Sequence, residues 1–272
     1  MNWKYFIGTL ITLPLLPILY FQGKSIRAKV PPLPEATGHE GTCENPSSNR
    51  KHIRVIALGE STIAGVGVAT HQEGFTGAFA KELSYLLGTS VDWKVYARSG
   101  YTAQKVVDRL LPKITESQAD VIVIGLGGND AFTLNRPSKW ASSIRSLIAS
   151  LQHQFPNAIL VFCNMPPIKE FPAFTPLIKF TIGNLVEILG ERLQTIVREY
   201  ENVYYFEEKI TVEGWMEKFQ VQGTSKDFFS DGVHPSQLTY QTWAKEIANG
   251  VSQQLTVNSP TFPVQTPTIG IH

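Results

Sequence analysis

Five short apolar runs alternate along the chain with helical stretches, and this alternation limits the possible folds more than any other feature. The runs, rich in β-branched and aromatic residues, are Ile53–Leu58, Trp93–Ala97, Val121–Leu126, Ala158–Cys163 and Val203–Phe206. Nearly continuous apolar runs of this length are typical of strands covered on both faces. The stretches that we expect to be helical are Phe75–Leu87, Ala103–Leu111, Ser138–Gln154, Pro176–Tyr200 and Gln237–Gln254. The pattern predicts a three-layer α/β/α fold around a five-stranded parallel sheet with right-handed crossovers.

In such a sheet, ligands bind outside the carboxyl ends of the strands, so the residues that follow each strand are the candidates for chemistry. The first strand is followed by the segment GEST, which contains Ser61. A serine at a strand-to-helix turn can project its hydroxyl among free backbone N–H groups. The same position also suits a serine that caps the next helix. Ser61 is therefore a candidate nucleophile with a structural alternative.

The next two strand ends carry glycines and an asparagine. Gly100 lies in the segment RSGYT, where a glycine permits close approach to the backbone N–H, although an ordinary turn glycine fits equally well. Asn129 lies in the segment GGND, and its amide can donate a hydrogen bond to a developing negative charge. The alternative for this segment is a helix-capping turn, for which Asp130 would serve as well.

A carboxylate and an imidazole lie close together near the C-terminus. Asp231 and His234 share the segment DGVHP, and their spacing allows Asp231 to accept a hydrogen bond from His234 Nδ1–H. Such a contact fixes the tautomer and leaves Nε2 as a general base. The remaining histidines, for which we expect structural roles, are His39, His52, His71, His153 and His272.

Together these residues can supply the nucleophile, the base and the oxyanion donors that acyl transfer needs. Ser61 needs a base because its hydroxyl is a poor nucleophile at neutral pH, and His234, oriented by Asp231, can supply one. The oxyanion of the tetrahedral intermediate needs preorganised donors. The N–H of Ser61, the N–H of Gly100 and the side-chain amide of Asn129 can provide them.

The four segments resemble, in order, the conserved blocks of the SGNH, or GDSL-type, hydrolase family. GEST is similar to the nucleophile block I, RSGYTA to block II, GGND to block III and DGVHP to block V, and the resemblance covers about residues 53–250. It implies the flavodoxin-like three-layer fold of SGNH hydrolases. It also implies that Ser61 is the nucleophile, Ser61, Gly100 and Asn129 the oxyanion donors, His234 the base and Asp231 its partner.

Block I departs from the family pattern at two positions. Glu60 stands where the family usually has Asp, and Thr62 where it commonly has Ser. Because Glu60 keeps the charge on a longer arm, we expect a changed local contact and not a loss of activity. Asp130, the last residue of block III, is expected to cap a helix or to orient Asn129.

The two ends of the chain differ from its middle. Residues 1–30 include an apolar run, residues 5–21, with Lys4 before it and Lys24, Arg27 and Lys29 after it. This is the general form of a secretory signal or a signal-anchor. We favour an uncleaved anchor that associates with a membrane; a cleaved signal and a buried core helix are the alternatives. The protein is then membrane-anchored or exported, on the periplasmic or extracytoplasmic side if it is bacterial.

The remaining boundaries follow from local composition. Residues 31–50, rich in Pro, Gly and Ser, predict a linker, and residues 51–255 form the hydrolase-type domain. Residues 256–272, rich in Thr, Pro and Ser, predict a disordered tail.

Composition excludes several classes of partner and cofactor. Twenty-four Lys+Arg against 23 Asp+Glu give a net charge of +1, which argues against a dedicated nucleic-acid binder. Two cysteines without a CxxC pair argue against a disulfide scaffold or a structural zinc site. Metal-assisted hydrolysis needs more ligands than Asp231 and His234 supply, so we expect no metal and no cofactor.

Two long loops bear on the substrate. Residues 164–176 include Phe171 and Phe174, and residues 210–230 include Trp215, Met216, Phe219, Phe228 and Phe229. These side chains can line an acyl-chain pocket or a lid, or can pack into the core. With a membrane tether, they favour a lipid-like acyl ester and an esterase, lipase or lysophospholipase-like activity. The alternatives are an O-acetylesterase or acyltransferase of an envelope polysaccharide, and a catalytically silent binding module.

Overall fold

The computed structural model describes residues 3–30, 32–46, 48, 51–224 and 226–258. Its centre is a six-stranded sheet with the order β1-β3-β2-β4-β5-β6. Five strands run parallel, and each overlaps one of the predicted apolar runs: β2 (Ile53–Gly59), β3 (Val91–Ala97), β4 (Val121–Gly125), β5 (Ile159–Phe162) and β6 (Val203–Tyr205). The prediction of a parallel α/β sheet is therefore confirmed.

The sixth strand corrects the predicted number of five. Strand β1 (Glu40–Cys43) pairs antiparallel with β3 at the sheet edge, so this part of the predicted linker belongs to the sheet. Its residues are alternately exposed and half-buried, and it has none of the apolar content that marks the other strands. Tertiary contacts hold it: Thr42 Oγ1 donates to Asp92 Oδ1 at 2.7 Å, and Gly41 packs directly against the ring of Trp93.

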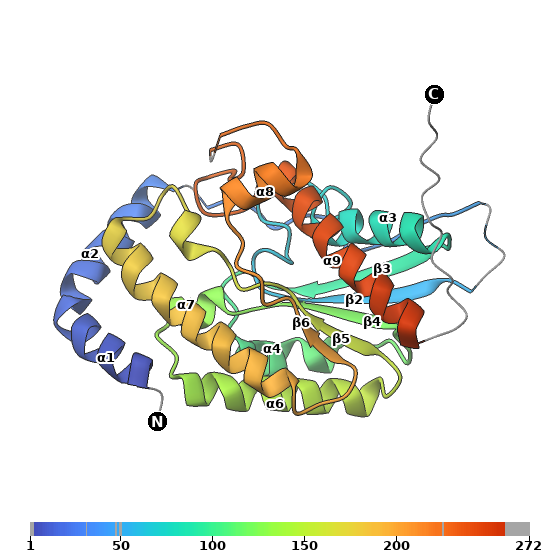
Figure 1. Ribbon diagram of the computed structural model, residues 1–272, viewed down its shortest axis with the longest axis horizontal. Helices are drawn as coiled ribbons and strands as arrows, with labels where there is room; N and C mark the ends of the chain where they lie inside the picture. Colours follow the sequence, from blue (N-terminus) through green and yellow to red (C-terminus); the bar gives the residue numbers. More distant parts are fainter. Residues whose placement is uncertain (1–2, 31, 47, 49–50, 225, 259–272) are drawn as a thin grey trace.

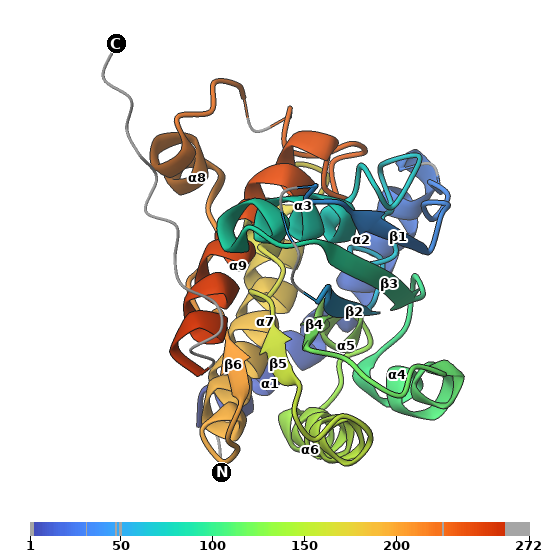
Figure 2. The same cartoon turned by 90° about the vertical axis from the view of Figure 1, so that its right-hand side faces the viewer.

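Helices cover both faces of the sheet, as the alternation predicts. Figure 1 shows α3 (Phe75–Leu87) and α9 (Gln237–Asn258) above the strands and α4 (Ala103–Arg109) and α6 (Pro137–Gln154) below them. Helix α7 (Pro176–Val197) packs beside α6. Figure 2, turned by 90°, shows the strands twisting between these two layers. Residues 256–258, the start of the predicted tail, continue α9, and residues 259–272 lie outside the described residues.

Local sequence explains where the helices begin. Thr102 and Thr175 cap α4 and α7, each accepting a hydrogen bond from a backbone N–H three residues on. Strand β4 is buried along its whole length, as a central strand covered on both faces must be. The shorter helices are α5 (Gly128–Phe132), α8 (Val212–Phe219) and three 3-10 helices, Leu13–Leu15, Leu111–Lys113 and Ile168–Glu170.

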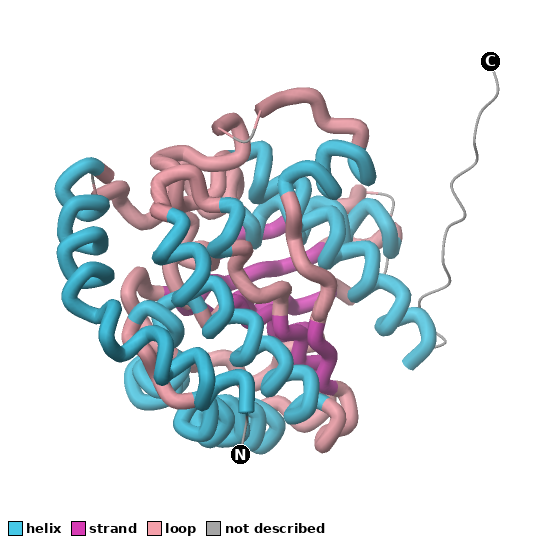
Figure 3. Tube along the Cα trace, turned by 60° about the vertical axis from the view of Figure 1, so that its left-hand side comes forward, coloured by secondary structure: helices cyan, strands magenta, loops and turns pink. Residues whose placement is uncertain are grey.

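The apolar N-terminal segment forms a helical arm outside the domain. It consists of α1 (Trp3–Thr12), the 3-10 turn and α2 (Leu16–Lys29), and Figure 3 shows it running along the outside of the domain. The whole of Trp3–Lys29 is long and apolar enough to cross a membrane, and no part of its most apolar stretch is buried in the structure. The alternative of a buried core helix is therefore wrong. The arm contacts α7 through Lys4, whose Nζ lies 2.5 Å from Glu191 Oε1.

Candidate active site

The ends of β2, β3 and β4 lie level with one another at one edge of the sheet. Gly59 is paired in register with Ala97 on one side and with Gly125 on the other. The backbone N–H of Arg98 donates to Gly59 O at 3.1 Å, and that of Glu60 donates to Gly125 O at 3.0 Å. The segments that carry Ser61, Gly100 and Asn129 therefore leave the sheet from adjacent strand ends.

Ser61 lies half-buried in the turn that follows β2. The turn is closed by backbone hydrogen bonds from Ala64 N to Glu60 O (2.8 Å) and from Val66 N to Ser61 O (3.1 Å). The next helix, α3, begins only at Phe75 and has Gly74 at its N-cap position. Helix capping, the structural alternative for Ser61, is therefore not its role here.

Asp231 and His234 form the predicted contact. His234 Nδ1 lies 2.8 Å from Asp231 Oδ2, and the backbone N–H groups of His234 and Val233 donate to Asp231 Oδ1 at 2.7 and 2.9 Å. Burial of the carboxyl group raises its pKa, but the hydrogen bonds from His234 and Val233 outweigh burial and hold the pKa of Asp231 below its ordinary value. With Asp231 ionised, the Nδ1–H tautomer of His234 is favoured and Nε2 carries the free lone pair.

The Ser61 loop and the His234 loop touch each other. Gly67 has φ +108°, and a Cβ at this position would lie 2.4 Å from the carbonyl oxygen of Pro235, so only glycine permits this approach. Tyr240 Oη also donates to Val66 O at 2.8 Å. In the described part of the chain, no hydrogen bond joins Ser61 Oγ to His234 Nε2. Such catalytic hydrogen bonds are often long in unliganded enzymes and shorten when substrate binds.

The two remaining oxyanion candidates are held by backbone geometry. Gly100 has φ +78°, is exposed, and has open space where a Cβ would stand. Asn129 donates one amide hydrogen from Nδ2 to Tyr101 O at 3.2 Å, and its side chain also interacts with the Glu60 carboxyl group; both contacts orient the amide. Both residues therefore present donors at the same strand edge as Ser61.

Glu60 holds the start of α5. Its buried carboxylate accepts hydrogen bonds from the backbone N–H groups of Gly128 (2.8 Å) and Asn129 (2.9 Å), at the start of α5. Burial raises the pKa of Glu60 to about 7, and the two N–H donors oppose that rise. Asp130 caps a helix, as expected: its carboxylate accepts from the N–H of Ala103, the first residue of α4, at 2.8 Å.

Two residues that support the site have no signal in the sequence pattern. Glu35 lies in the predicted linker, yet it accepts hydrogen bonds from the backbone N–H of Ser99 (2.7 Å) and from Arg98 (2.9 Å), and so braces the Gly100 loop. Tyr240 lies on α9, and an aromatic ring on the apolar face of a helix predicts core packing and no contact with the site. Only the tertiary structure relates these residues to the site.

A small apolar cavity of about 50 Å³ lies beside the site. It reaches Glu60, Thr62 and Pro235, the sequence neighbours of Ser61 and His234. Both of the apolar loops contribute to it, through Pro166, Pro167, Phe171, Ile210, Val212, Trp215, Phe228 and Phe229. Phe174, Met216 and Phe219 are not among its lining residues. Phe171, Trp215, Phe228 and Phe229 line the cavity and are also buried in the core, so the structure is consistent with both alternatives for these loops.

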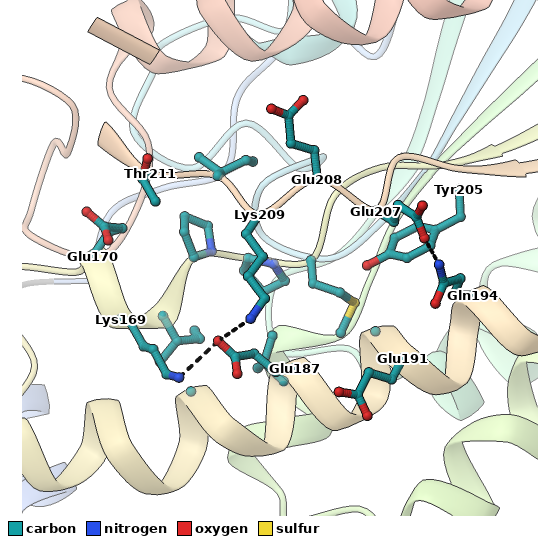
Figure 4. A pocket seen from close by; sticks show the side chains of 18 residues that line it. Lys169, Glu170, Glu187, Glu191, Gln194, Tyr205, Glu207, Glu208, Lys209 and Thr211 are labelled. Carbon is teal, nitrogen blue, oxygen red and sulfur yellow. Dashed lines mark hydrogen bonds and ion pairs between the residues drawn. The ribbon is translucent and has the colours of Figure 1, made fainter. Parts of the chain in front are cut away.

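A larger groove of about 220 Å³ adjoins this cavity and shares Pro166, Pro167 and Ile210 with it. Figure 4 shows Glu187 of α7 between Lys169 and Lys209, with its carboxylate 2.9 and 3.1 Å from their ammonium groups. None of the candidate catalytic residues lines this groove, so we assign the chemistry to the strand edge described above. Among the described residues, no group of three His, Cys, Asp or Glu side chains is placed to hold a metal ion.

Comparison with known proteins identifies the family. Residues 57–242 match the model of the GDSL-like lipase/acylhydrolase family. A GDSL esterase/lipase from Arabidopsis thaliana is 26% identical over 208 residues, which cover 69% of this chain and 84% of the relative.

Solved structures share the fold at low sequence identity. A family two carbohydrate esterase from Clostridium thermocellum has a TM-score of 0.56 at 16% identity, covering 76% of this chain and 66% of that chain. TesA has a TM-score of 0.53 at 19% identity, covering 77% of this chain and 99% of TesA. A lipase from a goat rumen metagenome has a TM-score of 0.53 at 17% identity, covering 72% and 96%. The fold is therefore that of the SGNH hydrolases.

Proposed function

The chain belongs to the GDSL-like lipase/acylhydrolase family and is a carboxylic ester hydrolase, and from this premise we propose that it cleaves acyl esters through a covalent acyl-enzyme on Ser61. The observation that carries the proposal is the 2.8 Å contact between His234 Nδ1 and Asp231 Oδ2, in a loop that touches the Ser61 loop. A base held in one tautomer beside a serine is the arrangement that activates a hydroxyl nucleophile.

The proposed reaction has two halves. His234 Nε2 takes the proton of Ser61 Oγ as Oγ bonds to the carbonyl carbon, and the carbonyl electron pair moves onto oxygen. Collapse of this intermediate expels the alcohol oxygen, which receives the proton from His234, and leaves the acyl group on Ser61. Water, deprotonated by His234, then attacks the acyl carbon; the acid is released and Ser61 Oγ regains its proton.

Three donors stabilise the oxyanion in both halves: the N–H of Ser61, the N–H of Gly100 and the side-chain amide of Asn129. Removing one such donor typically costs about 2.7–4 kcal/mol of transition-state stabilisation. Level strand ends and the hydrogen bond from Asn129 to Tyr101 O support this assignment, because they fix the donors before substrate binds.

We propose that the substrate is a lipid-like acyl ester. We also propose that the enzyme is exported and that its N-terminal arm holds it at a membrane. The apolar lining of the cavity beside Glu60 and Thr62 supports an acyl group as its occupant. The length and apolar character of Trp3–Lys29 support the membrane association. A second candidate is removal or transfer of acetyl groups on a polysaccharide, which the fold similarity to a carbohydrate esterase and the small volume of the cavity favour.

The test is hydrolysis of a graded series of acyl esters, from acetyl to long chains, by the full chain in detergent. Ser61→Ala and His234→Ala should abolish turnover. The matched controls are Ser142→Ala and His153→Ala, which change exposed residues of α6 and should leave turnover unchanged. A preference for short chains would favour the acetylesterase, and a preference for long chains the lipase. Full activity in Ser61→Ala, or no hydrolysis of any ester by the folded protein, would refute the proposal.

A further inference from the structure

Large apolar side chains that the domain leaves exposed gather at one place. Among the described residues outside the N-terminal arm, four large apolar side chains are exposed: Tyr85, Phe132, Leu134 and Phe180. Phe132 ends α5 and Leu134 follows two residues later, while Phe180 lies on α7, which packs against α5. We call Phe132, Leu134 and Phe180 the apolar rim.

Leu134 stands in an unfavourable conformation for its residue type. Its φ is +54°, in the left-handed region that suits Gly or Asn, and its side chain is 40% exposed. Backbone strain of this kind clusters at functional sites.

The apolar rim is continuous with the N-terminal arm. Leu134 and Phe180 line a cavity of about 470 Å³ whose other wall is formed by the arm, through Ile7, Ile11 and Leu13. The arm is the helix that is long and apolar enough to cross a membrane. Lipid that surrounds the arm would therefore extend to the apolar rim.

A row of aromatic rings leads from the apolar rim to the cavity beside the site. Phe132 lies 5.5 Å from Phe174, Phe174 lies 5.3 Å from Phe171, and Phe171 lies 5.2 Å from Phe229, measured between ring centroids. Phe171 and Phe229 line the cavity that reaches Glu60 and Thr62. Phe174, Phe171 and Phe229 are buried, so the row is a band of packed apolar contacts that joins Phe132 to the cavity.

Positive charge lies beside the apolar rim. Arg136 and Lys139 are exposed, line a shallow open depression together with Leu134, and form no ion pair with any residue that the structure describes. Basic side chains next to exposed apolar ones suit the surface of a bilayer that contains anionic lipids.

We propose that the apolar rim rests in the surface of a lipid bilayer, so that an acyl ester passes from the membrane to the site on the side of the domain where this row of rings lies. This inference rests on the proposed membrane association and adds the face of the domain that meets the lipid. Its failure can be separated from that of the proposed function, because its first readout does not use catalysis.

The experiment places nitroxide labels on the full chain in vesicles of zwitterionic and anionic phospholipids. Leu10→Cys reports on the arm, and Leu134→Cys and Phe180→Cys report on the apolar rim. The control is Tyr85→Cys, at an exposed position of α3. All four variants carry Cys43→Ser. Oxygen dissolves in lipid and a nickel chelate does not. We expect the ratio of oxygen to nickel accessibility at 10, 134 and 180 to exceed that at 85 severalfold.

Each other result overturns the inference. If the labels at 134 and 180 are as accessible to nickel as the label at 85 while the label at 10 is in lipid, the arm enters the membrane but the apolar rim does not. If all labels are in water, neither the arm nor the apolar rim enters the membrane. Labels at 134 and 180 shielded from oxygen and nickel alike, in a protein that sediments as a dimer, would assign the face to a second copy.

A second measurement uses the reaction. In the double variant Leu134→Asn and Phe180→Gln, asparagine suits the left-handed backbone, so the fold should persist. Hydrolysis of a long-chain ester embedded in vesicles should fall roughly tenfold, since two apolar side chains no longer enter the lipid. Hydrolysis of a soluble short-chain ester should stay unchanged. An equal loss on both esters, or on neither, would contradict docking; the absence of any hydrolysis by the unmutated protein would instead count against the proposed function.

Discussion

The carboxylate of Glu60 accepts a hydrogen bond from the backbone N–H of Asn129 at 2.9 Å. The residue before the candidate nucleophile thereby holds the backbone of the candidate oxyanion donor. The two residues are 69 positions apart in sequence. The contact gives Glu60 a structural role, because it ties the end of β2 to the start of α5.

Asn129→Ala should lower kcat by roughly 10²–10³-fold and change KM little, because the lost amide hydrogen acts on the oxyanion and not on the bound ester. Steady-state kinetics on a short-chain ester measures both constants. Asn157→Ala, at an exposed asparagine remote in sequence, is the control. A kcat within twofold of the unmutated value would remove Asn129 from the oxyanion hole.

Glu60→Ala should act through Asn129. Two buried N–H groups lose their acceptor, so we expect a loss of about 1–3 kcal/mol in the free energy of unfolding and a smaller loss in kcat than Asn129→Ala causes. In an Asn129→Ala background, Glu60→Ala should have little further effect on kcat, which a double-mutant cycle tests. Additive losses would mean that Glu60 acts on the reaction independently. Glu60→Asp, which restores the common family residue, should keep most of the activity.

Glu60 also predicts a pH dependence of stability. Its pKa is about 7 in the folded protein and near 4.5 when exposed, so the folded state binds the proton more tightly. The contribution of Glu60 to the free energy of unfolding is therefore full below about pH 4.5. It falls by roughly 3 kcal/mol in all as the pH rises through 7. Urea unfolding of the unmutated protein and of Glu60→Gln across this range should diverge at the alkaline end, with the variant relatively more stable. A difference that is constant with pH would contradict the shifted pKa.

Asp231→Asn should reduce kcat by roughly 10³–10⁴-fold while the fold stays intact. An amide in place of the carboxylate can donate to Nδ1 and so favour the wrong tautomer of His234. The effect should appear in kcat, and circular dichroism should match that of the unmutated protein. Asp227→Asn, an exposed neighbour in the same loop, should leave kcat unchanged. Equal losses in both variants would point to general damage to the loop.

The parallel sheet and most of its helices could be predicted because each element carries its own pattern. Strand β4 is apolar at every position and α3 has the predicted bounds, so local burial and periodicity were sufficient. The positions of the candidates Ser61, Gly100 and Asn129 at one edge of the sheet could be predicted because the carboxyl ends of parallel strands lie at a common edge. The register of Gly59 with Ala97 and Gly125 is the physical basis of that prediction.

Other features depend on contacts between distant residues. Strand β1 has no apolar alternation, and it is defined by its pairing with β3 and its packing on Trp93. Glu35 supports the Gly100 loop from 64 residues away, within a segment whose Pro and Gly content is typical of a linker. The hydrogen bond between Asp231 and His234 could be predicted from their spacing, because both residues belong to one turn.

His71 gives a pH dependence of the opposite sign. It is 1% exposed, lies 5.1 Å from the His39 ring, and its Nε2 has no hydrogen-bond partner among the described residues. Burial, with a smaller contribution from His39, lowers the pKa of His71 to about 4, against 6.5 when exposed. The unfolded state therefore binds the proton more tightly, and stability is lost as the pH falls from about 6.5 to 4, by up to roughly 3 kcal/mol.

Replacing the imidazole removes this loss. We expect His71→Leu to gain stability relative to the unmutated protein as the pH falls through that range, because leucine does not take up a proton on unfolding. The measurement is urea unfolding at a series of pH values between 4 and 7, with His153→Leu, at an exposed position of α6, as the matched control. Parallel stability curves for His71→Leu and the unmutated protein would mean that His71 is hydrated in solution and titrates near its ordinary pKa.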